Sequence, residues 1–549
     1  MRAADVATAA SAECSDNPSA RSDVASLAKA APSKKRKVNE GERLDSRHCS
    51  RGVQRSLAKH STFQLEPYVF SAPLWDATNE VSKPCDVAML LPHDLLDRMI
   101  PEGKEEEYCK FVAGQEGFEH DVGSWCERTH CDMSGSFVAP CALWGDAAPY
   151  SRRDSIYVLV LTLLSGVHRI YWKLCCLTKR SVCDCGCHGR HTFDQLFAVI
   201  SWSFRACLAG EHPAFDHTGA AWPIGSARAR LAGQRLRVRG ALIRFLGDWA
   251  WIKQSLGLRG WRGEGTDRQI CWLCPASLQG ACPCYDFRSN ADWVQSLTTM
   301  AQYWTATRFQ DVFVSTLWGI PGMTILNVEP DFMHCSCLGI VQYLNGNVLW
   351  ELFVQAGGTR TNWKGACGQL MGMIRTAAKE LHMDPPISQL TIGMIRGKRG
   401  PKAKLKAAEG RYLLKVLVYI LPNYYSCETD HELLRFRCAS FLKRVYDELD
   451  HWQDGGESTR RLEDLGRRHL LLYAELSNEA ELASEGALEW RLFPKHHLFA
   501  HCTRGQLTNP KSTWAYRLEG EIGKCVEIAA GCNVLHMQTM FIRRIIQTM

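Results

Sequence analysis

The pattern of hydrophobic and polar positions along the chain predicts a mixed α/β core followed by a long helical region. Alternating apolar residues at 236–246 predict a strand that ends at Gly247 and Asp248, and residues 249–256 predict a short helix. Upstream, the pattern predicts three more strands and one amphipathic helix, at 137–145, 156–164, 168–174 and 192–210. The predicted order is therefore strand, strand, strand, helix, strand, helix.

Two aspartates stand where predicted strands end. Asp146 follows the first strand and Asp248 follows the fourth. Open α/β sheets place their chemistry at the carboxyl ends of strands, and this order of elements is typical of the RNase H-like fold of nucleases, integrases and transposases. Carboxylates there suit Mg²⁺ or Mn²⁺, because hard cations take oxygen ligands and a pair of ions can assist phosphodiester cleavage. The alternative is that each aspartate ends a strand or, for Asp248, caps the next helix.

The composition along the chain predicts five regions. Residues 1–60 are rich in Ala, Ser and charge without apolar periodicity, which predicts a disordered tail. A small accessory region at 61–135 and the first part of the core at 136–290 follow. Residues 291–495 are predicted to form a mainly helical insertion domain, and residues 496–549 the closing helices of the core.

The tail contains a compact basic cluster that predicts a nuclear protein. Its residues Lys34, Lys35, Arg36 and Lys37 resemble a monopartite nuclear import signal, so an import receptor is an expected partner. The N-terminus has no apolar segment typical of a secretion signal. The longest apolar run, 156–164, is too short to span a bilayer, so no membrane partner is expected.

Composition narrows the chemistry further. The chain of 549 residues is 46% hydrophobic and 22% charged, as in a soluble globular protein, and its net charge of +7 is compatible with nucleic acid without requiring it. It holds 25 cysteines. Without secretion these thiols are expected to stay reduced, so clustered cysteines favour metal over disulfides.

The strongest metal signal combines Cys271 and Cys274, in the motif CWLC, with His497 and His501, which are one helical turn apart. They predict a Cys₂His₂ zinc site, with His496 as the alternative to His497. Buried thiols and surface histidines are the structural alternative. A rival site uses Cys183, Cys185, Cys187 and His188, although CxCxC spacing is tight for one tetrahedral ion. A third group, Cys126, His130 and Cys131, more often has no metal role.

A dense basic run lies within the helical region. It comprises Lys398, Arg399, Lys402, Lys404 and Lys406. Such a run is usually a solvated face, but in a nuclease it is a candidate for contacts with DNA phosphates.

Taken in order, six motifs from residue 143 to the C-terminus resemble eukaryotic cut-and-paste DDE/D transposases, in particular the CACTA-like (En/Spm) and related families. They are GDAAPYSRRDS at Asp146, LGDWAWI at Asp248, CWLC at Cys271, DFMH at Asp331, PKHHLFAH at His497 and WAYRLEGEIG at Glu519. The chain departs from this pattern at Ala147, where many relatives have glycine.

The resemblance implies DNA strand cleavage and strand transfer by a DDE-type site that uses Mg²⁺ or Mn²⁺, with DNA as partner and a homo-oligomer on the DNA. The residues alone leave the third acid open among Glu519, Glu521 and Glu527, and the resemblance favours Glu519. Asp331 and His334 form a family motif without an assigned role. About 270 residues separate Asp248 from Glu519, which requires a domain between them.

Two other functions compete with an active transposase. One is a domesticated or decayed relative that binds DNA in the nucleus without cleaving it. The other is a structural zinc protein in which the acids are incidental.

Overall fold

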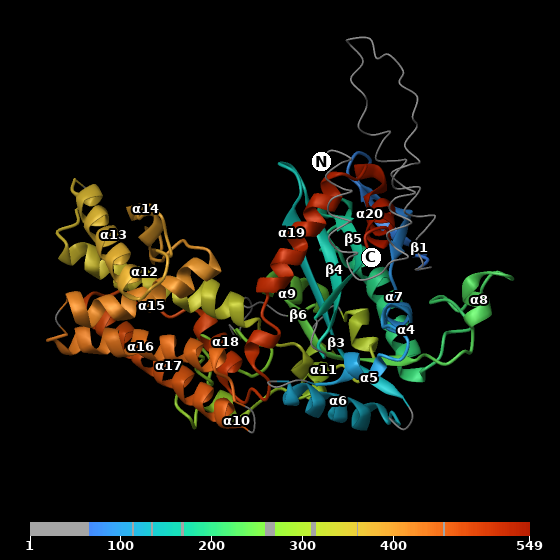
Figure 1. Cartoon of the computed structure of the whole chain (residues 1–549), viewed down its shortest axis with the longest axis horizontal. Coiled ribbons are helices and arrows are strands. Elements are labelled where there is room, and N and C mark those ends of the chain that lie inside the picture. Colours follow the sequence, from blue (N-terminus) through green and yellow to red (C-terminus); the bar gives the residue numbers. More distant parts are fainter. Residues whose placement is uncertain are drawn as a thin grey trace, which may run out of the picture. The chain divides into compact units, whose positions relative to one another are not determined.

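The computed structural model describes residues 65–111, 115–132, 136–165, 169–258, 269–308, 314–359, 361–425, 427–453 and 456–549. These residues belong to one compact unit, Phe63–Met549 (Figure 1). The predicted tail at 1–60, with the import signal at Lys34, Lys35, Arg36 and Lys37, lies outside the described residues.

A mixed four-stranded sheet forms the α/β part of the fold, in the spatial order β5-β4-β3-β6. Three strands make an antiparallel meander, and the fourth returns parallel to the first of them. Their bounds are β3 Phe137–Pro149, β4 Ser155–Leu163, β5 Ile170–Thr178 and β6 Val238–Gly247. The four strands and their order along the chain are as the hydrophobic pattern predicts.

The prediction that the first strand ends before Asp146 is wrong. The parallel pairing of β3 with β6 ends at Gly145 and Gly247, but the antiparallel pairing of β3 with β4 continues to Pro149. The hairpin turn around Asp154 accounts for this, because its carbonyl accepts hydrogen bonds from Tyr150 N and Ser151 N and extends the ladder. Asp146 therefore lies inside a strand that has lost its partner on one side only.

One further segment takes a parallel position beside the sheet. Val328 forms an isolated parallel bridge with Phe245 of β6, and the side chain of Asn327 donates to the Ile243 carbonyl at 3.0 Å. The segment therefore leads Asp331 toward the same edge of the sheet as Asp248. The sequence pattern did not predict this.

Helices cover the sheet. Helix α7 (Arg190–Ala209) packs against β6 and against the hairpin of β1 (Tyr68–Asp76) and β2 (Val81–Met89). Helix α19 (Tyr516–Ala530) packs against β3 and β4, and α20 (Met537–Ile546) against β5. The remaining helices of this part are α4 Pro92–Met99, α5 Glu105–Cys109, α6 Glu116–Thr129, α8 Ala227–Leu231 and α9 Trp249–Leu256.

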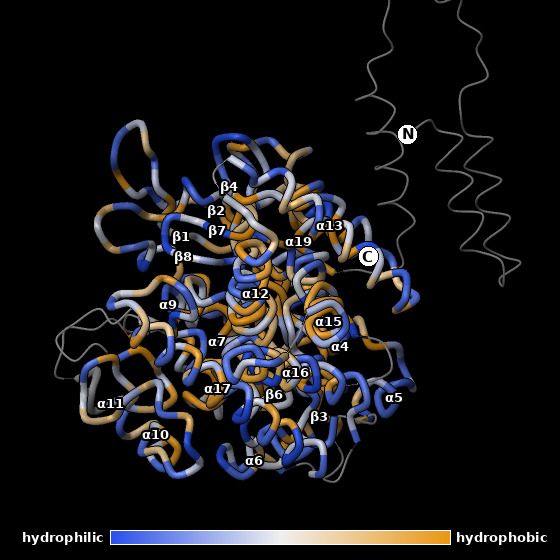
Figure 2. Tube along the Cα trace, turned by 90° about the vertical axis from the view of Figure 1, so that its left-hand side faces the viewer, coloured by the Kyte–Doolittle hydropathy of each residue, from blue (hydrophilic) through white to orange (hydrophobic). Residues whose placement is uncertain are grey.

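The stretch between the CxxC motif and α19 is mainly helical, as predicted. Its helices are α10 Asp292–Gln295, α11 Met300–Arg308, α12 Val341–Gln355, α13 Trp363–Glu380, α14 Ile392–Ile395, α15 Ala407–Tyr424, α16 Asp430–Asp450, α17 Glu457–Ala483 and α18 Pro494–Thr503. Helix α12 is buried on nearly every side, and hydrophobic positions gather around it in Figure 2. None of the described helices is both long enough and apolar enough to cross a membrane.

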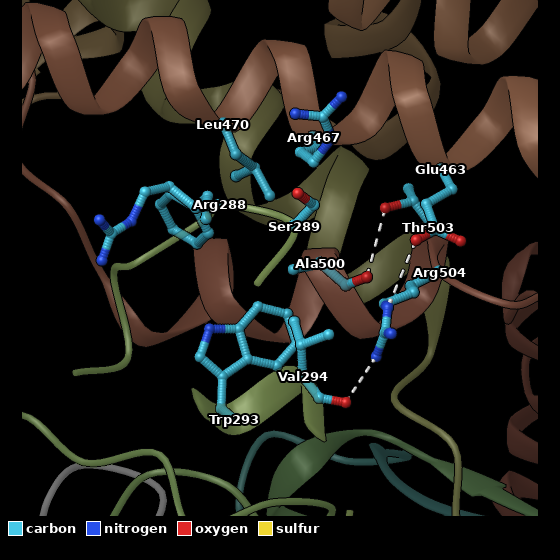
Figure 3. A pocket seen from close by; sticks show the side chains of 11 residues that line it. Arg288, Ser289, Trp293, Val294, Glu463, Arg467, Leu470, Ala500, Thr503 and Arg504 are labelled. Carbon is cyan, nitrogen blue, oxygen red and sulfur yellow. Dashed lines mark hydrogen bonds and ion pairs between the residues drawn. The ribbon is translucent and has the colours of Figure 1, made fainter. Parts of the chain in front are cut away.

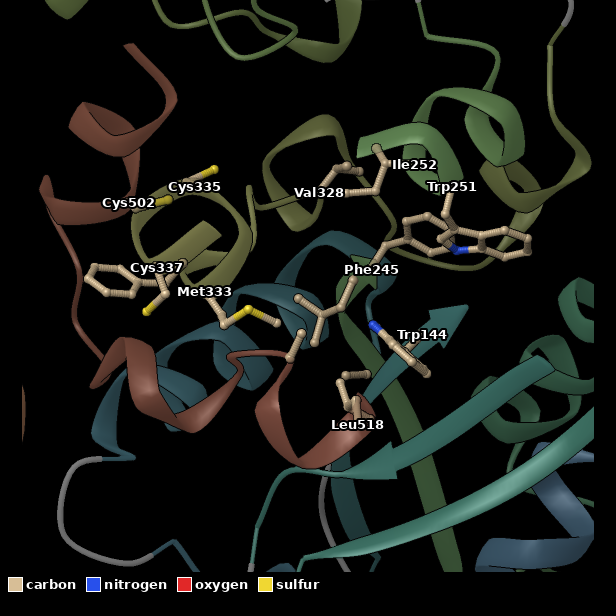
Figure 4. Close-up of a cluster of buried hydrophobic side chains, with 14 of the residues drawn as sticks. Trp144, Phe245, Trp251, Ile252, Val328, Met333, Cys335, Cys337, Cys502 and Leu518 are labelled. Atoms are coloured by element: carbon tan, nitrogen blue, oxygen red, sulfur yellow. The ribbon is translucent and has the colours of Figure 1, made fainter. Parts of the chain in front are cut away.

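A buried cluster of apolar side chains joins the sheet to the helical region. Phe245 from the sheet, Val328 from the bridging segment, Met333 from the π-helix Met333–Ile340 and Leu518 from α19 lie together in it (Figure 4). Burying side chains of this size stabilises a fold by about 1.5–3 kcal/mol each. The elements that carry the candidate site residues therefore share one core.

Trp251, on α9, packs directly on the two glycines that precede the aspartates. A Cβ at Gly145 would lie 2.2 Å from Trp251 Cε2, and a Cβ at Gly247 would lie 2.3 Å from Trp251 Cδ1. Phe193 and Phe197 of α7 hold the indole from the other side, with ring centroids 5.7 and 6.2 Å away. Both positions therefore require glycine because an indole occupies the space of a side chain.

We expect Gly145→Ala to lower the free energy of unfolding by about 1–3 kcal/mol, since the new methyl group must displace a buried tryptophan. Chemical denaturation of the full-length chain measures this. Gly523→Ala is the matched control, because nothing lies within 4 Å of its Cβ on α19. The control should be neutral or stabilising by up to about 1 kcal/mol. Equal effects of the two substitutions would contradict the proposed packing.

Candidate active site and metal centres

The parallel pairing of β3 and β6 sets Asp146 and Asp248 side by side. Gly145 and Gly247 are register partners, and each aspartate is the next residue. Neighbouring strands lie about 4.8 Å apart. The two aspartates predicted from strand ends thus lie at one edge of the sheet.

Asp248 is also a helix cap, the alternative that the sequence left open. Its Oδ1 accepts a hydrogen bond from Trp251 N at 2.7 Å at the start of α9. The cap engages one carboxylate oxygen and fixes the side chain at the sheet edge. Capping and a role in a metal site are therefore compatible.

The surroundings of Asp146 disfavour its charged form. Burial, followed by the negative charge of Asp248, raises its pKa to about 6, and Glu519 adds to the rise. The backbone N–H of Ala147 donates to Asp146 Oδ1 at 2.6 Å and opposes the shift. A carboxyl that loses its proton only near pH 6 in the company of other acids is a good ligand for a divalent cation.

Among the three glutamates of α19, only Glu519 faces this region. Its Oε1 lies 3.9 Å from His334 Nε2, and burial raises its pKa, with Asp331 raising and His334 lowering it. Glu521 instead pairs with Lys173 and, at 2.7 Å, with Lys524. Glu527 is exposed. The geometry thus separates the three glutamates that the residues alone left open.

Asp331 and His334 complete the group. Asp331 Oδ2 accepts from His334 N and from His334 Nδ1, both at 2.7 Å, and Asp331 Oδ1 accepts from Ala515 N at 2.9 Å. Burial lowers the pKa of His334, but the hydrogen bond and charge of Asp331 outweigh it and raise the pKa to about 9. Asp331 therefore ties the start of α19 to a histidine that carries a positive charge at neutral pH.

Lys495 links the acids to α18. Its ammonium donates to the carbonyls of His334 at 2.8 Å and Leu338 at 3.0 Å, and its charge acts on Asp248 and Asp331. The site therefore contains two cations, His334 and Lys495, facing several acids. Sequence reasoning missed Lys495, since a lysine at a helix start has no distinctive pattern.

The three predicted acids do not form a closed ligand set. Within the part of the chain that the structure describes, three groups of metal-ligating side chains have all their ligand atoms within 4.8 Å of one another, and Asp146, Asp248 and Glu519 are not among them. Carboxylates repel one another, which opposes a tight cluster. The acids are close enough for Asp248 and Glu519 to affect the charge of Asp146. They do not form a closed set of metal ligands.

Cys271, Cys274, His497 and His501 do form such a group, and all four are buried. Cys274 Sγ lies 3.2 Å from His497 Nε2 and 3.4 Å from His501 Nε2, and Cys271 Sγ lies 3.5 Å from His501 Nε2. Two thiols and two imidazoles in this arrangement could hold a metal ion such as zinc. Residues 223 to 230 positions apart in sequence thus meet, as predicted for this ligand set.

Surrounding groups orient these ligands. His497 Nδ1 lies 2.9 Å from the Cys284 carbonyl, which leaves Nε2 toward the cysteines. Burial raises the pKa of Cys274 to about 11, with Cys271 adding to the shift, so this thiol needs a cation nearby to ionise. His496 is not in the group: its Nδ1 accepts from Phe493 N at 3.0 Å and its ring lies 4.4 Å from that of Tyr473. The structure thus chooses His497 over His496.

A pocket lies behind this cluster, between α17, α18 and residues 287–294 (Figure 3). Trp293 lies in its wall and packs on the imidazoles of His497 and His501, with ring centroids 4.8 and 5.1 Å apart. Arg504 spans the pocket, donating to the Val294 carbonyl at 3.1 Å and lying 3.4 Å from Glu463. These contacts brace α18 against the segment that follows the CxxC motif.

The rival cysteine cluster also brings four possible metal ligands together, but its histidine is not the predicted one. Cys183, Cys185 and Cys187 group with His191, and the prediction of His188 is wrong. His188 lies in the loop with a left-handed backbone, with φ of 55°, whereas His191 lies one position into α7 and its imidazole reaches the cysteines. This cluster, too, could hold a metal ion such as zinc.

The other candidate groups have structural explanations. Cys126, His130 and Cys131 are not among the groups found in the described residues. His93, Asp94 and His212 form the third group, but Asp94 is paired with Arg228 at 2.7 Å, so a cation already neutralises it. This buried network joins the accessory region, through His93 and Asp94, to His212 and Arg228 of the first part of the core.

The basic run forms a hairpin and an extended segment on the surface. Lys398 and Arg399 are the exposed turn between β7 (Arg396–Gly397) and β8 (Gly400–Pro401). After it, exposed Lys404 and Lys406 alternate with buried apolar residues. Lys402 is half-buried over the ring of Tyr343 at 5.0 Å, and burial and the charge of Lys495 lower its pKa. Lys402 therefore lies close enough to Lys495, the lysine beside the acids, to be affected by its charge.

The chain matches no protein-family model, and no curated protein matches it.

We expect Cys271→Ser and His501→Ala each to lower the zinc content by about one ion per chain and to reduce stability, because structural zinc contributes directly to folding. Metal analysis of the purified full-length chain measures this. His496→Gln is the matched control and should keep its zinc. Full zinc content in both Cys271→Ser and His501→Ala would rule out this ligand set.

We expect the stability difference between wild type and Asp331→Asn to depend on pH. The folded pKa of His334, about 9, lies above the unfolded value of about 6.5, so the pair's stabilisation is full below pH 6.5 and is lost as pH rises through 9. The difference should shrink by about 1–3 kcal/mol between pH 6 and pH 9.5 in denaturation curves.

Asparagine keeps an acceptor for Ala515 N, so the change isolates the charge. Asp464→Asn serves as the control, because Asp464 pairs with arginines, Arg467 and Arg468, whose charge is constant over this range. A pH-independent difference for Asp331→Asn would show that His334 is not held as a cation.

Proposed function

We propose that the protein is a DDE-type DNA transposase whose sheet and helices form an RNase H-like core, with Asp146, Asp248 and Glu519 as its catalytic acids. The observation that carries the proposal is that Asp146 and Asp248 follow register partners on two parallel strands, with the charge of Glu519 also acting on Asp146. The order of strands, β5-β4-β3-β6 with β6 alone parallel to β3, supports it.

The donor set fits Mg²⁺ or Mn²⁺. Carboxylate oxygens are the ligands that hard divalent cations prefer, and mutual repulsion of the acids makes ion binding favourable. When bound, two such ions activate an attacking oxygen and stabilise the leaving oxygen of a phosphodiester. The three acids would hold the ions, while the backbone N–H of Ala147 orients Asp146 and the cap on α9 orients Asp248.

His334 and Lys495 give the site its positive side. His334 lies beside Glu519 with its charge maintained by Asp331, so it can orient that carboxylate or meet a phosphate oxygen. Lys495 is held by two carbonyls and influences Asp248. Both cations would partly neutralise the negative charge of a DNA phosphate that binds next to the acids.

We further propose that Lys398, Arg399, Lys402, Lys404 and Lys406 contact DNA phosphates. The alternation of buried apolar residues with exposed cations places Lys404 and Lys406 on the same face of the segment. Gly346 of α12 permits this, since a Cβ there would lie 2.5 Å from Lys402 Cα. A nuclear location, import through the basic tail and a homo-oligomer on DNA belong to the same proposal.

We expect Asp146→Asn, Asp248→Asn and Glu519→Gln each to lower Mn²⁺-dependent nicking of supercoiled DNA by about 100-fold or more, with DNA binding retained. Asparagine preserves the helix cap at Asp248. Glu527→Gln, exposed on the same helix, is the control and should nick normally. In wild type, nicking should fall as pH drops through 6, because Asp146 then takes up a proton.

Nicking that survives Asp146→Asn would exclude this site. DNA binding by a wild-type chain that never nicks would instead favour the second candidate, a decayed or domesticated transposase that acts as a nuclear DNA-binding protein.

A further inference from the structure

The loop between β5 and α7 gathers three thiols and an imidazole well away in sequence from the CxxC motif. Cys183 Sγ lies 3.4 Å from Cys185 Sγ, and His191 Nδ1 lies 3.5 Å from the first sulfur and 3.4 Å from the second. All four ligand atoms, Cys187 Sγ included, lie within 4.8 Å of one another. Around tetrahedral zinc, with bonds of about 2.3 Å to sulfur and 2.0 Å to nitrogen, ligand atoms stand roughly 3.5–3.8 Å apart.

We propose that Cys183, Cys185, Cys187 and His191 bind a second, structural zinc ion as a Cys₃His set. Its ligands are separate from those of the Cys271 site and from the three proposed catalytic acids.

The backbone of the loop removes the objection that CxCxC spacing is too tight. Gly186, His188 and Gly189 all adopt left-handed conformations, with φ of 88°, 55° and 85°. The chain therefore curls around the sulfurs, and Gly189 N and Arg190 N donate to the carbonyls of Cys183 and Cys187, each at 3.1 Å. A fourth ligand then comes from the first turn of α7.

Neighbouring groups support the ligands as in other structural metal sites. Ser82 Oγ, on β2, donates to Cys183 Sγ at 2.8 Å. Thr192 Oγ1 accepts from Cys183 N at 3.0 Å and donates to the Pro73 carbonyl of β1 at 2.6 Å. A hydroxyl donor to a sulfur stabilises its thiolate form. The cluster thus lies where the β1–β2 hairpin, the loop and α7 meet.

The loop also supports the helix that carries Asp248. Gln254 Nε2, on α9, donates to the His188 carbonyl at 3.1 Å, and its Oε1 accepts from Tyr157 OH of β4 at 3.2 Å. Because Asp248 caps the other end of α9, a zinc ion that fixes the loop would also hold α9 against the sheet. The second zinc therefore has a structural effect on the acid-bearing edge.

Zinc content of the full-length chain, purified under reducing conditions, tests the proposal. We expect about two zinc ions per wild-type chain, and about one in His191→Gln and in Cys271→Ser, with none in the double variant. His191 is exposed, so its substitution does not disturb the core. His188→Asn is the matched control: it lies in the same loop, asparagine tolerates its left-handed backbone, and it should keep both ions.

Cobalt substitution in Cys271→Ser isolates the second site. We expect tetrahedral Co²⁺ with thiolate charge-transfer absorption, which His191→Gln then weakens. Amide exchange along α9 should quicken in His191→Gln and stay unchanged in His188→Asn.

A Cys271→Ser chain without zinc, or a His191→Gln chain with wild-type zinc content, would overturn the site. A Cys183–Cys185 disulfide in the reduced preparation would also overturn it. Unchanged exchange in α9 would overturn its structural effect on that helix.

Discussion

The site depends on one packing contact, the indole of Trp251 on the backbone of Gly145 and Gly247. The two glycines are register partners in the parallel pair β3–β6, and each precedes an aspartate. With side chains there, the tryptophan could not approach, α9 would lie farther from the sheet, and its cap Asp248 would move with it. The contact therefore couples the hydrophobic core to the relative position of two carboxylates.

Interactions between distant segments bring the third acid to this edge. Asp331 follows the segment that bridges to β6, and its carboxylate binds both His334 and the backbone of Ala515 at the start of the Glu519 helix. Lys495 then joins α18 to the carbonyls around the same π-helix. Charged groups thus connect elements separated by more than a hundred residues, and their pKa shifts record that proximity.

The two cysteine–histidine clusters each join segments that lie far apart along the chain. One joins the segment after α9 to α18, ahead of Glu519, and the other joins the loop before α7 to the β1–β2 hairpin. A metal ion at either place would cross-link segments that chain connectivity leaves far apart, and it would stabilise the fold because the unfolded chain has no preformed site to bind it. Because about 270 residues separate Asp248 from Glu519, such cross-links would help to hold the segments that carry these acids in place.

The sequence by itself indicated the four strands of the main sheet and the helices that flank them, because these follow from local periodicity. It also indicated the pairing of CxxC with His497 and His501, because the ligand types suit zinc and the fold implied by the resemblance makes their segments neighbours. Only the tertiary structure decided that β3 continues past Asp146, that His191 replaces His188, and that Glu519 lies beside His334 while Glu521 pairs with Lys173. These outcomes depend on left-handed loop residues, on hairpin pairing and on contacts between remote segments. Such interactions have no local sequence period, so their energies are set only when the segments meet.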